Sequence, residues 1–316
     1  SANRRSGFAE FCNSVVGESA ADQLRSACGY DSLLHPHLPI EAGFSILNHH
    51  PETESLFNGR ATRWLCLRDG LQALAQAMMR ELGDDVDLHM GAELKAIERP
   101  TGGDRGYRLR FTSDRGAFRD RADLVILAAL PQDAQRIHGW PGRSSDGADA
   151  TLEGIPLLKG YVQFEKAWWN ESFPDSNCVI ADTPLRKLYI TAGSRTLWFY
   201  CDGPSARALN GILETCGGLP TELLERHLGC RLPKGTDADQ CRWKFWESGI
   251  GFYRNSPPSK CQSSFMALAP DLLLCSDIFT DHLGWAEGCL ISAQAAVQYL
   301  QSTSALNGSR QLALAA

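Results

Sequence analysis

The sequence predicts a mixed α/β (α+β) fold with two domains that the chain enters more than once. The first observation is length, because 316 residues are enough for about two cores of ordinary size. The second is the apolar pattern, in which stretches with helical spacing alternate with short runs typical of strands. The third is a change in composition near residue 151, where strands rich in aromatic residues begin. Near residue 266 the chain returns to a buried strand and a helix.

Four segments follow from this order. Residues 1–65 are expected to be helical, and residues 66–150 to supply a helix and several strands of one domain. Residues 151–265 are expected to form most of the other domain, from a mixed sheet and helices. Residues 266–316 then return to the first domain with a strand and a helix. A chain that crosses back and forth between two domains produces this order.

Helices are expected at the start of the chain and again near residue 70. Apolar residues recur at three- and four-residue spacing in "GFAEFCNSVV" and "SAADQLRSACGYDSLL". In a second helix, over residues 69–83, Asp69 can cap the first turn and Gly83 can end the last. Its apolar stripe consists of Leu71, Leu74, Ala75, Met78 and Leu82.

Three strands are expected after this helix. They lie within residues 87–100, 107–113 and 121–130, separated by turns rich in Gly and Asp. The run "ADLVILAAL" is apolar throughout, as expected for a strand buried on both faces. Pro131 then begins a short helix.

The second half of the chain alternates between helices and strands, and its strands contain many aromatic residues. Strands with many aromatic residues are expected within 160–169, 178–184, 187–193 and 196–203. Helices are expected over 206–217 and 221–232, where apolar residues have helical spacing.

Composition excludes several classes of function. The net charge of −6 gives no support for nucleic-acid binding, and no apolar run reaches the ~18 residues that span a membrane. The start, "SANRRSGFAEFCNS", lacks the apolar core of a signal peptide. The 11 cysteines have no zinc spacing, so we expect reduced thiols in a cytoplasmic protein.

Three segments carry a family resemblance when they are taken in order. The first runs from "DGLQALAQAMMREL" to "ADLVILAALP", and the second is "LLKGYVQFEKAWW". The third, "DLLLCSDIFTDHLGWAEGCLISAQAAVQYL", has a strand, an acidic loop, a Gly-Trp-Ala-Glu-Gly turn and a helix. Together they resemble the flavin amine oxidase family, which includes monoamine oxidase, polyamine oxidase and L-amino-acid oxidase.

The resemblance implies roles for residues in the first two segments. In relatives the main chain at the position of Leu94 contacts the flavin adenine. Lys159 falls on the family lysine that holds a water at flavin N5, and Phe164, Trp168 and Trp169 match the spacing that follows it. A buried ammonium can orient water or oxygen and stabilise developing negative charge. The bland alternative is a surface lysine at the start of a strand.

The third segment implies a place for the flavin. In the family its pyrimidine edge and ribityl chain lie on the N-terminus of the last helix, where free N–H groups favour anionic oxygens. Cofactor contacts are therefore expected at Ser276, Asp277, Trp285, Ala286 and Glu287. The chain departs from the family at Ser276, where glycine is usual, which puts close backbone approach in doubt. The alternative is an ordinary helix start with Glu in its first turn.

The phosphate-binding glycine loop of the family is not found in this sequence. Whole relatives begin with a strand, GxGxxG and a helix, whose glycines let the backbone approach the pyrophosphate. Here "TGGDRG" looks like a hairpin turn and "GIGFYR" lacks a third glycine. We therefore expect a partial Rossmann-type (GR2-like) FAD-binding domain from 66–150 and 266–316. A second polypeptide carrying the glycine loop is expected to complete it, as a heterodimer or larger complex.

The strand "DTPLRKLYITAG" bears on the substrate. It is similar to a Pro-x-Arg-x-x-Tyr strand of bacterial L-amino-acid oxidases, in which the tyrosine hydroxyl bonds the substrate carboxylate. The resemblance gives this role to Tyr189. The alternative is that Tyr189 is only a half-buried aromatic residue of the strand, with a structural role. Arg186 is a weaker local candidate for holding the carboxylate, because the subfamily's arginine normally follows the glycine loop.

Aromatic residues are expected to enclose the substrate. Trp285, preceded by Gly284, falls at a position of the family's aromatic cage, where a flat ring excludes water. Trp246 and Phe252, in "RWKFWESGIGFY", are candidates for the opposite wall of the pocket, as is Trp243. The alternative for Trp285 is a core residue at a helix start.

The implied activity is FAD-dependent oxidation of an L-amino acid to a 2-oxo acid, ammonia and hydrogen peroxide. The cofactor is expected to be noncovalent, because no cysteine lies near the family's attachment position. Hydride transfer to the flavin requires no side-chain base, and the protein positions the substrate. A second hypothesis is that the substrate is a plain amine or polyamine. A third is that the chain is a non-catalytic scaffold subunit of a flavoprotein complex.

Overall fold

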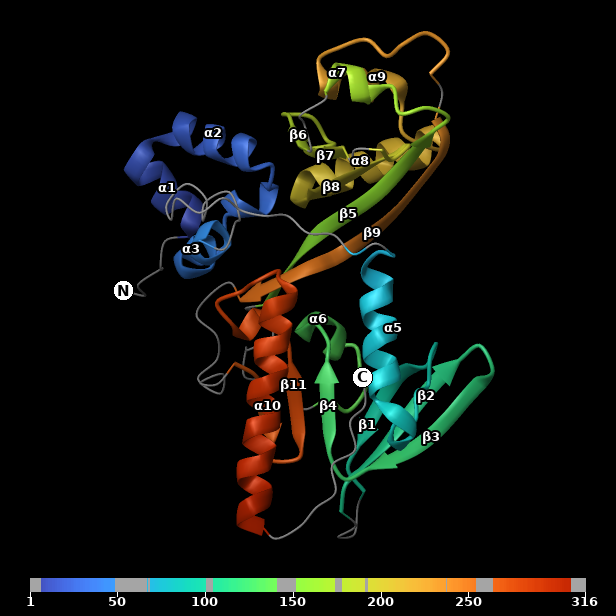
Figure 1. Cartoon of the computed structure of the whole chain (residues 1–316). Helices are drawn as coiled ribbons and strands as arrows, with labels where there is room; N and C mark the ends of the chain where they lie inside the picture. Colours follow the sequence, from blue (N-terminus) through green and yellow to red (C-terminus); the bar gives the residue numbers. More distant parts are fainter. Residues whose placement is uncertain are drawn as a thin grey trace. The chain divides into compact units, whose positions relative to one another are not determined.

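The computed structural model describes residues 7–48, 67, 69–100, 105–140, 152–173, 178–190, 193–236, 238–253 and 264–307 (Figure 1). It divides the chain into two compact units. Unit 1 consists of Ser1–Gly43 and Glu153–Asn255, and unit 2 of Phe44–Leu152 and Ser256–Ala316. The units therefore change after residues 43, 152 and 255, where we expected changes after 65, 150 and 265. The assignment of either unit to flavin or substrate stays a prediction.

The helices of unit 1 near the start of the chain are short. They are α1 (Phe8–Val16), α2 (Glu18–Cys28), the 3-10 turn η1 (Asp31–Leu34) and α3 (Ile40–Asn48), which runs on into unit 2. α1 and α2 lie where apolar spacing predicted them, whereas no such spacing was identified over α3. Gly29 ends α2 with φ +66°, a left-handed conformation that favours glycine. Phe8, Leu33 and Leu38 are buried and anchor this region.

A five-stranded sheet forms the centre of unit 1, in the order β6-β7-β8-β5-β9. The strands are β5 (Leu152–Phe164), β6 (Cys178–Ile180), β7 (Lys187–Ile190), β8 (Thr196–Asp202) and β9 (Ala238–Tyr253). The helices α7 (Trp169–Ser172), α8 (Gly203–Cys216) and α9 (Thr221–Leu228) complete the unit. The sequence located β5 to β8, α8 and α9, whereas β9 was not identified as a strand.

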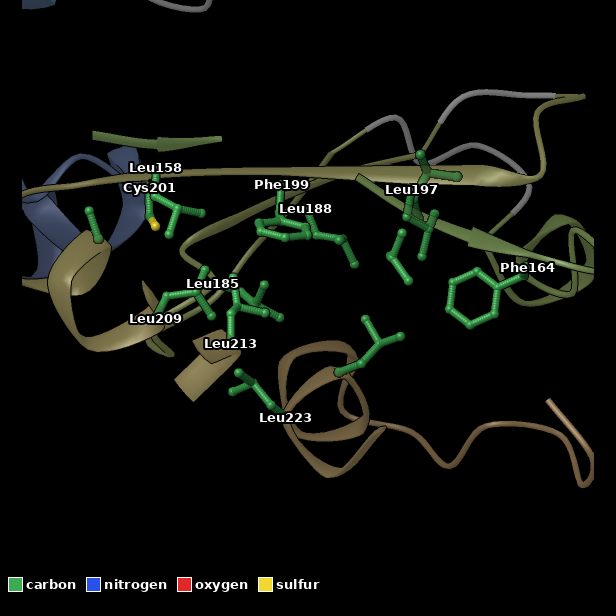
Figure 2. Close-up of a cluster of buried hydrophobic side chains, with 14 of the residues drawn as sticks. Leu158, Phe164, Leu185, Leu188, Leu197, Phe199, Cys201, Leu209, Leu213 and Leu223 are labelled. Atoms are coloured by element: carbon green, nitrogen blue, oxygen red, sulfur yellow. The ribbon is translucent and has the colours of Figure 1, made fainter. Parts of the chain in front are cut away.

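One face of this sheet is sealed by a hydrophobic core (Figure 2). Alternate residues of β8 and β7, such as Leu197, Phe199 and Leu188, point into it, and Leu209 and Leu213 of α8 enter from the helical side. Because side chains of a strand alternate between faces, the residues between them belong to the opposite face. That opposite face carries Lys159 and Tyr189, two of the predicted site residues of unit 1.

In the described part of unit 2 there are two three-stranded sheets and two long helices. The elements are α5 (Leu71–Glu81), η2 (Gly83–Asp85), β1 (Glu93–Glu98), β2 (Tyr107–Ser113), β3 (Gly116–Ala122), β4 (Val125–Ala128), α6 (Pro131–Ala134), β10 (Met266–Ala269), β11 (Leu272–Cys275), η5 (Asp277–Phe279) and α10 (Ala286–Asn307). β1, β2 and β3 form an antiparallel meander, and the second sheet has the order β10-β11-β4.

The second sheet of unit 2 has the buried parallel strands that the apolar runs predicted. β11 pairs in parallel with β4, from Leu272 opposite Val125 to Cys275 opposite Ala128. Leu272 and Leu274 enter one hydrophobic cluster, and Leu273 and Cys275 enter another on the other face. Covering both faces is typical of parallel sheets in α/β proteins. Among the described strands, β4 lies at an edge of this sheet.

Helix α5 forms where it was predicted, but two details differ. Gly70 stands at its N-cap position without a side-chain cap, so Asp69 does not cap it. The apolar stripe is exposed: Leu71 is 73% exposed, Leu74 50% and Met78 55%. Ala73 and Ala77 on another side of the helix are the half-buried positions. Helical spacing identifies an apolar face but not what covers it.

No helix within the described residues is both long and apolar enough to cross a bilayer.

Candidate functional site

The loop after β11 places the expected cofactor residues at the start of α10. The backbone N–H of Ser276 donates to Ser292 Oγ of α10 at 3.0 Å, and Ser276 Oγ donates to Asp277 Oδ1 at 3.0 Å. The other oxygen, Asp277 Oδ2, accepts the N–H of Gly284 at 2.7 Å. Both side chains are buried, so Asp277 holds the turn through its carboxylate.

Two glycines shape this turn for different reasons. Gly284 has φ +81°, which favours glycine over any residue with a side chain. A Cβ on Gly288 would lie 2.6 Å from the carbonyl oxygen of His282 and 2.6 Å from Thr280 Oγ1. The first turn of α10 can therefore approach the preceding loop only because residue 288 has no side chain.

The outer side of the turn is exposed in unit 2. Trp285 is 37% exposed, and Ala286 and Glu287 are exposed as well. The first N–H groups of a helix have no intrahelical acceptor, and the helix dipole is positive there. The turn thus presents an indole ring beside backbone donors. The carboxylate of Glu287 lies 3.9 Å from His282 Nδ1.

In unit 1, the sheet face opposite the core brings Lys159 and Tyr189 to the same tryptophan. The Tyr189 ring stacks on Trp198, with centroids 3.6 Å apart and planes at 5°. Lys159 Nζ lies over the Trp198 ring, 5.4 Å from its centroid, in a cation–π contact. The strand register explains the meeting. Tyr189 of β7 and Tyr161 of β5 both lie opposite Trp198 of β8, and Lys159, two residues before Tyr161, lies on the same face of β5.

We call the group Lys159, Tyr161, Tyr189 and Trp198 the aromatic face of unit 1. Sequence reasoning missed Trp198, although the alternation in "TLWFYCDG" separates it from the core residues Leu197 and Phe199. Only the pairing of β7, β8 and β5, which are distant in sequence, shows that this ring connects the two predicted residues.

One end of the same sheet face is closed by the residues after α2. Lys187 is buried, and its Nζ lies 3.2 Å from the centroid of the Tyr30 ring. Tyr30 also contacts the Tyr200 ring edge-on, with centroids 5.9 Å apart. Burial is the main reason why the pKa of Tyr200 is well above its usual value. Tyr161, at 48% exposed, lies on the more open part of the face.

Arg186 is held inside unit 1 rather than on the aromatic face. Its guanidinium lies 3.2 Å from Asp31 Oδ1 and 2.9 Å from Asp182 Oδ1, and it donates to the carbonyl oxygen of Arg25 at 3.0 Å. The side chain is 2% exposed and the backbone has φ +52°. Through these contacts, Arg186 holds α2 and η1 against the sheet.

The remaining predicted residues are dispersed. Trp243 and Phe245 of β9 pack against the core, so alternation places Trp246, 39% exposed, toward the other face of the sheet. Phe252 is buried and contacts the His35 ring edge-on, with centroids 5.3 Å apart. Leu94 of β1 is half-buried next to a register shift between β1 and β2. None of these observations tests a contact with substrate or flavin.

Comparison with known proteins supports the fold. No protein-family model matches the chain. Among solved structures, the chain is similar to cyclohexylamine oxidase from Brevibacterium oxydans IH-35A, with a TM-score of 0.63 and 14% sequence identity. The match covers 95% of this chain and 68% of that chain. The fold is therefore like that of this amine oxidase.

Proposed function

We propose that this chain is part of an FAD-dependent oxidase that acts on a primary amine. The observation that carries the proposal is the aromatic face, where Lys159 and Tyr189 meet on Trp198 in a fold like that of an amine oxidase. FAD, when bound, would accept the hydride from the substrate carbon that bears the amine. Loss of this hydride from the neutral amine would leave an iminium ion, which water hydrolyses to a carbonyl compound and ammonium.

The start of α10 fits the flavin in its chemistry. Its backbone donors and dipole suit the anionic and carbonyl oxygens of the cofactor, and Gly284 and Gly288 keep the backbone unobstructed. Ser276 and Asp277 support this turn from beneath through hydrogen bonds. We assign Trp285, Ala286 and Glu287 to contacts with the ring system, and Ser276 and Asp277 to positioning that turn.

We assign Lys159 to hold water or oxygen near the reacting atoms, because an ammonium stabilises developing negative charge. Replacing Lys159 with Met keeps much of the side chain and removes the charge. We expect rapid-mixing absorbance measurements to show at least a tenfold slower reduction or reoxidation of the flavin. Lys166→Met changes an exposed lysine just beyond the same strand and serves as the control. Unchanged rates in both half-reactions of Lys159→Met would remove Lys159 from the mechanism.

The substrate class that we propose is an L-amino acid, with the Tyr189 hydroxyl donating to its carboxylate. The stack on Trp198 fixes the ring of Tyr189, which makes the hydroxyl a well-placed single donor. An amine without a carboxylate is the second candidate. It is favoured by the engagement of Arg186 with Asp31 and Asp182, and by the amine after which the similar oxidase is named.

A comparison of each amino acid with its decarboxylated amine separates these candidates. The purified protein is mixed with a panel of both under nitrogen, and bleaching of the flavin absorbance is followed. In the amino-acid case, Tyr189→Phe keeps the stack on Trp198 and raises KM for the amino acid about tenfold or more, since it removes one hydrogen bond to a charged group. The KM for the amine then stays unchanged. Bleaching by amines alone would exclude the amino-acid proposal.

We further propose that a second polypeptide with the GxGxxG unit completes unit 2. Two surfaces support this. Leu71, Leu74 and Met78 of the α5 stripe are exposed, and β4 is an edge strand among the described strands. Exposed apolar patches and open edges of parallel strands are normally covered in soluble proteins. About a third of the similar oxidase has no counterpart in this chain, which is room for such a unit.

Native mass spectrometry of the assembly purified from its source tests this partner. We expect a complex containing this chain, a second chain and FAD. Leu74→Asp places a charge in the stripe and should release both the partner and FAD, whereas Gln72→Asp on the same helix should not. A flavin-loaded monomer of this chain alone would contradict the proposal.

A further inference from the structure

Two histidines and a glutamate of unit 1 lie together away from the aromatic face. They are His35 and His37, just after η1, and Glu153, near the start of β5. His37 Nδ1 lies 2.6 Å from Glu153 Oε1, and His35 Nδ1 lies 3.5 Å from Glu153 Oε2. One ligand atom from each residue lies within 4.8 Å of the others. The proposed oxidation gives this group no role.

The histidines are held by a tight turn. The N–H of Leu38 donates to the carbonyl oxygen of His35 at 3.0 Å, which closes the turn His35–Leu38. Pro36 restricts His35 to extended backbone, and His35 indeed has φ −62° and ψ 131°. Leu38 is buried, and its carbonyl oxygen accepts the N–H of Phe8 at 2.7 Å. The imidazoles are therefore attached to backbone that is already fixed.

The distances are close to those around a small cation. Two ligands of a tetrahedral Zn²⁺ at bond lengths of about 2.0–2.1 Å lie about 3.3 Å apart. The separation of His35 Nδ1 and Glu153 Oε2, 3.5 Å, is already of this size. His37 Nδ1 and Glu153 Oε1 are now at hydrogen-bond distance, 2.6 Å, and need to move apart by about 0.7 Å to reach this separation. A shift of that size is within reach of a rotation of the carboxylate or of the His37 ring.

The protonation pattern also suits a metal. The backbone N–H of His37 points to His35 Nδ1 at 3.3 Å, so this nitrogen acts as an acceptor and carries a lone pair. A nitrogen that accepts cannot also donate to Glu153 Oε2. A cation bound at His35 Nδ1 replaces this weak hydrogen bond, and one bound at His37 Nδ1 displaces the proton shared with Glu153 Oε1. The negative charge of the Glu153 carboxylate favours both exchanges.

The surroundings leave one side open. The His35 ring packs edge-on against Phe252, and the Glu153 side chain is 14% exposed, while that of His37 is 42% exposed. Three protein ligands with access to solvent leave a position for water. Two imidazoles with one carboxylate favour Zn²⁺ and neighbouring transition metals over Mg²⁺ or Ca²⁺, which prefer oxygen ligands alone.

We propose that His35, His37 and Glu153 form a binding site for Zn²⁺, independent of the oxidase activity. The bound ion ties the turn after η1 to the beginning of β5, two segments that are far apart in the chain. Because the unfolded chain has no such preformed site, binding should stabilise unit 1.

The experiment uses the tag-free assembly, dialysed against EDTA and then against metal-free buffer. Zn²⁺ is titrated in competition with a chromophoric chelator, and Co²⁺ is used as a spectroscopic probe of geometry. We expect one equivalent of Zn²⁺ per chain and intense visible bands with Co²⁺. His37→Gln and Glu153→Gln should each lower Zn²⁺ affinity at least tenfold. His89→Gln is the matched control, because His89 lies 3.2 Å from Asp87 without a third ligand group among the described residues.

Each outcome decides for or against the site. Equal Zn²⁺ affinity in the wild type and in both cluster variants would overturn the proposal, as would the absence of saturable binding in the wild type. The two variants insert neutral amides at a partly exposed cluster, and circular dichroism checks their fold. A readout within the wild type alone is also available: Zn²⁺ should raise the melting temperature, and EDTA should reverse the rise.

Discussion

The apolar side chains are buried on the inner face of the sheet of unit 1, but they are exposed on helix α5 of unit 2. The inner face of the sheet is covered by α8 and α9, so that Leu188, Leu197 and Phe199 are fully buried (Figure 2). The stripe of α5 has the same kind of residues, yet Leu71 and Leu74 are exposed. The sheet of unit 1 is therefore covered on its inner face within the chain, whereas unit 2 leaves the stripe of α5 exposed, which is the surface that the proposed second polypeptide would cover.

Polar groups show the same contrast and give the largest expected effect. In unit 1, buried Asp31 lies beside Arg186 and accepts the N–H of Ser205 at 3.0 Å. Asp31→Asn leaves the Arg186 charge with weaker compensation in the interior, and we expect a loss of about 3–5 kcal/mol in the free energy of unfolding. Chemical denaturation of the assembly measures it.

The counterpart in unit 2 is Asp271, which lies 2.7 Å from Arg99, a side chain that is 60% exposed. Asp271→Asn keeps an oxygen that accepts the hydroxyl of Tyr107, so we expect a loss of less than about 1 kcal/mol. Equal losses for the two substitutions would mean that the burial of Asp31 does not govern its contribution.

A pair of leucines tests the apolar side of the comparison. Leu188→Ala in unit 1 removes a fully buried side chain from the core, and we expect a loss of about 2–5 kcal/mol. Leu74→Ala in α5 should change the unfolding free energy of this chain alone by no more than about 0.5 kcal/mol. In the assembly the same change should weaken binding of the second polypeptide. If Leu74→Ala destabilises the isolated chain as much as Leu188→Ala, the stripe is covered within the chain.

Local sequence patterns predicted most elements but not what lies against them. The aromatic-rich run "TLWFYCDG" and the apolar run "ADLVILAAL" identified β8 and β4, because the residue types that favour strands can be seen within a short segment. The stripe of α5 was visible in the sequence for the same reason, but whether it is exposed depends on which distant segments pack against it. β9 was missed because "ADQCRWKFWESGIGFY" mixes charged, glycine and aromatic residues, which do not alternate cleanly.

The candidate site shows a similar limit. Tyr189 and Lys159 were singled out by resemblance, but Trp198 enters only through the register of three strands. Arg186 looked available in sequence, and the partner that engages it, Asp31, is distant in the chain. The pair His35 and His37 is local, whereas Glu153 joins them only in the fold. Contacts between distant segments are what one sequence does not supply.

A buried carboxyl gives unit 1 a pH dependence of intermediate size. Asp202 accepts the backbone N–H of Asp31 at 2.7 Å and also the Ser32 hydroxyl, yet burial raises its pKa to about 6. In the unfolded chain the value is about 3.9, so the folded state holds the proton more tightly between these pH values. This contribution is therefore fully present below about pH 4 and is lost as pH rises through 6, by roughly 2–3 kcal/mol.

The measurement compares the wild type with Asp202→Asn at several pH values. The difference is needed because burial lowers the pKa of His227, and that contribution has the opposite sign, since it is lost as pH falls through the lowered pKa. His227 is common to both proteins, so its effect cancels. We expect the free-energy difference between the two proteins to change from pH 4 to pH 7. A constant difference would show that Asp202 has its ordinary pKa in the folded protein.

Two glycines give the smallest and most direct test of the contrast between the units. Gly211 lies inside α8, and a Cβ there would meet nothing within 4 Å, so Gly211→Ala should stabilise unit 1 by about 0.5–1 kcal/mol. Gly284 also has open space, but its φ of +81° is strained for alanine, so Gly284→Ala should destabilise unit 2 by about 1 kcal/mol. Thermal unfolding of both variants gives the signs. Because the space around the two residues is alike, opposite signs can come only from backbone conformation, and equal signs would mean that the turn before α10 does not require its left-handed glycine.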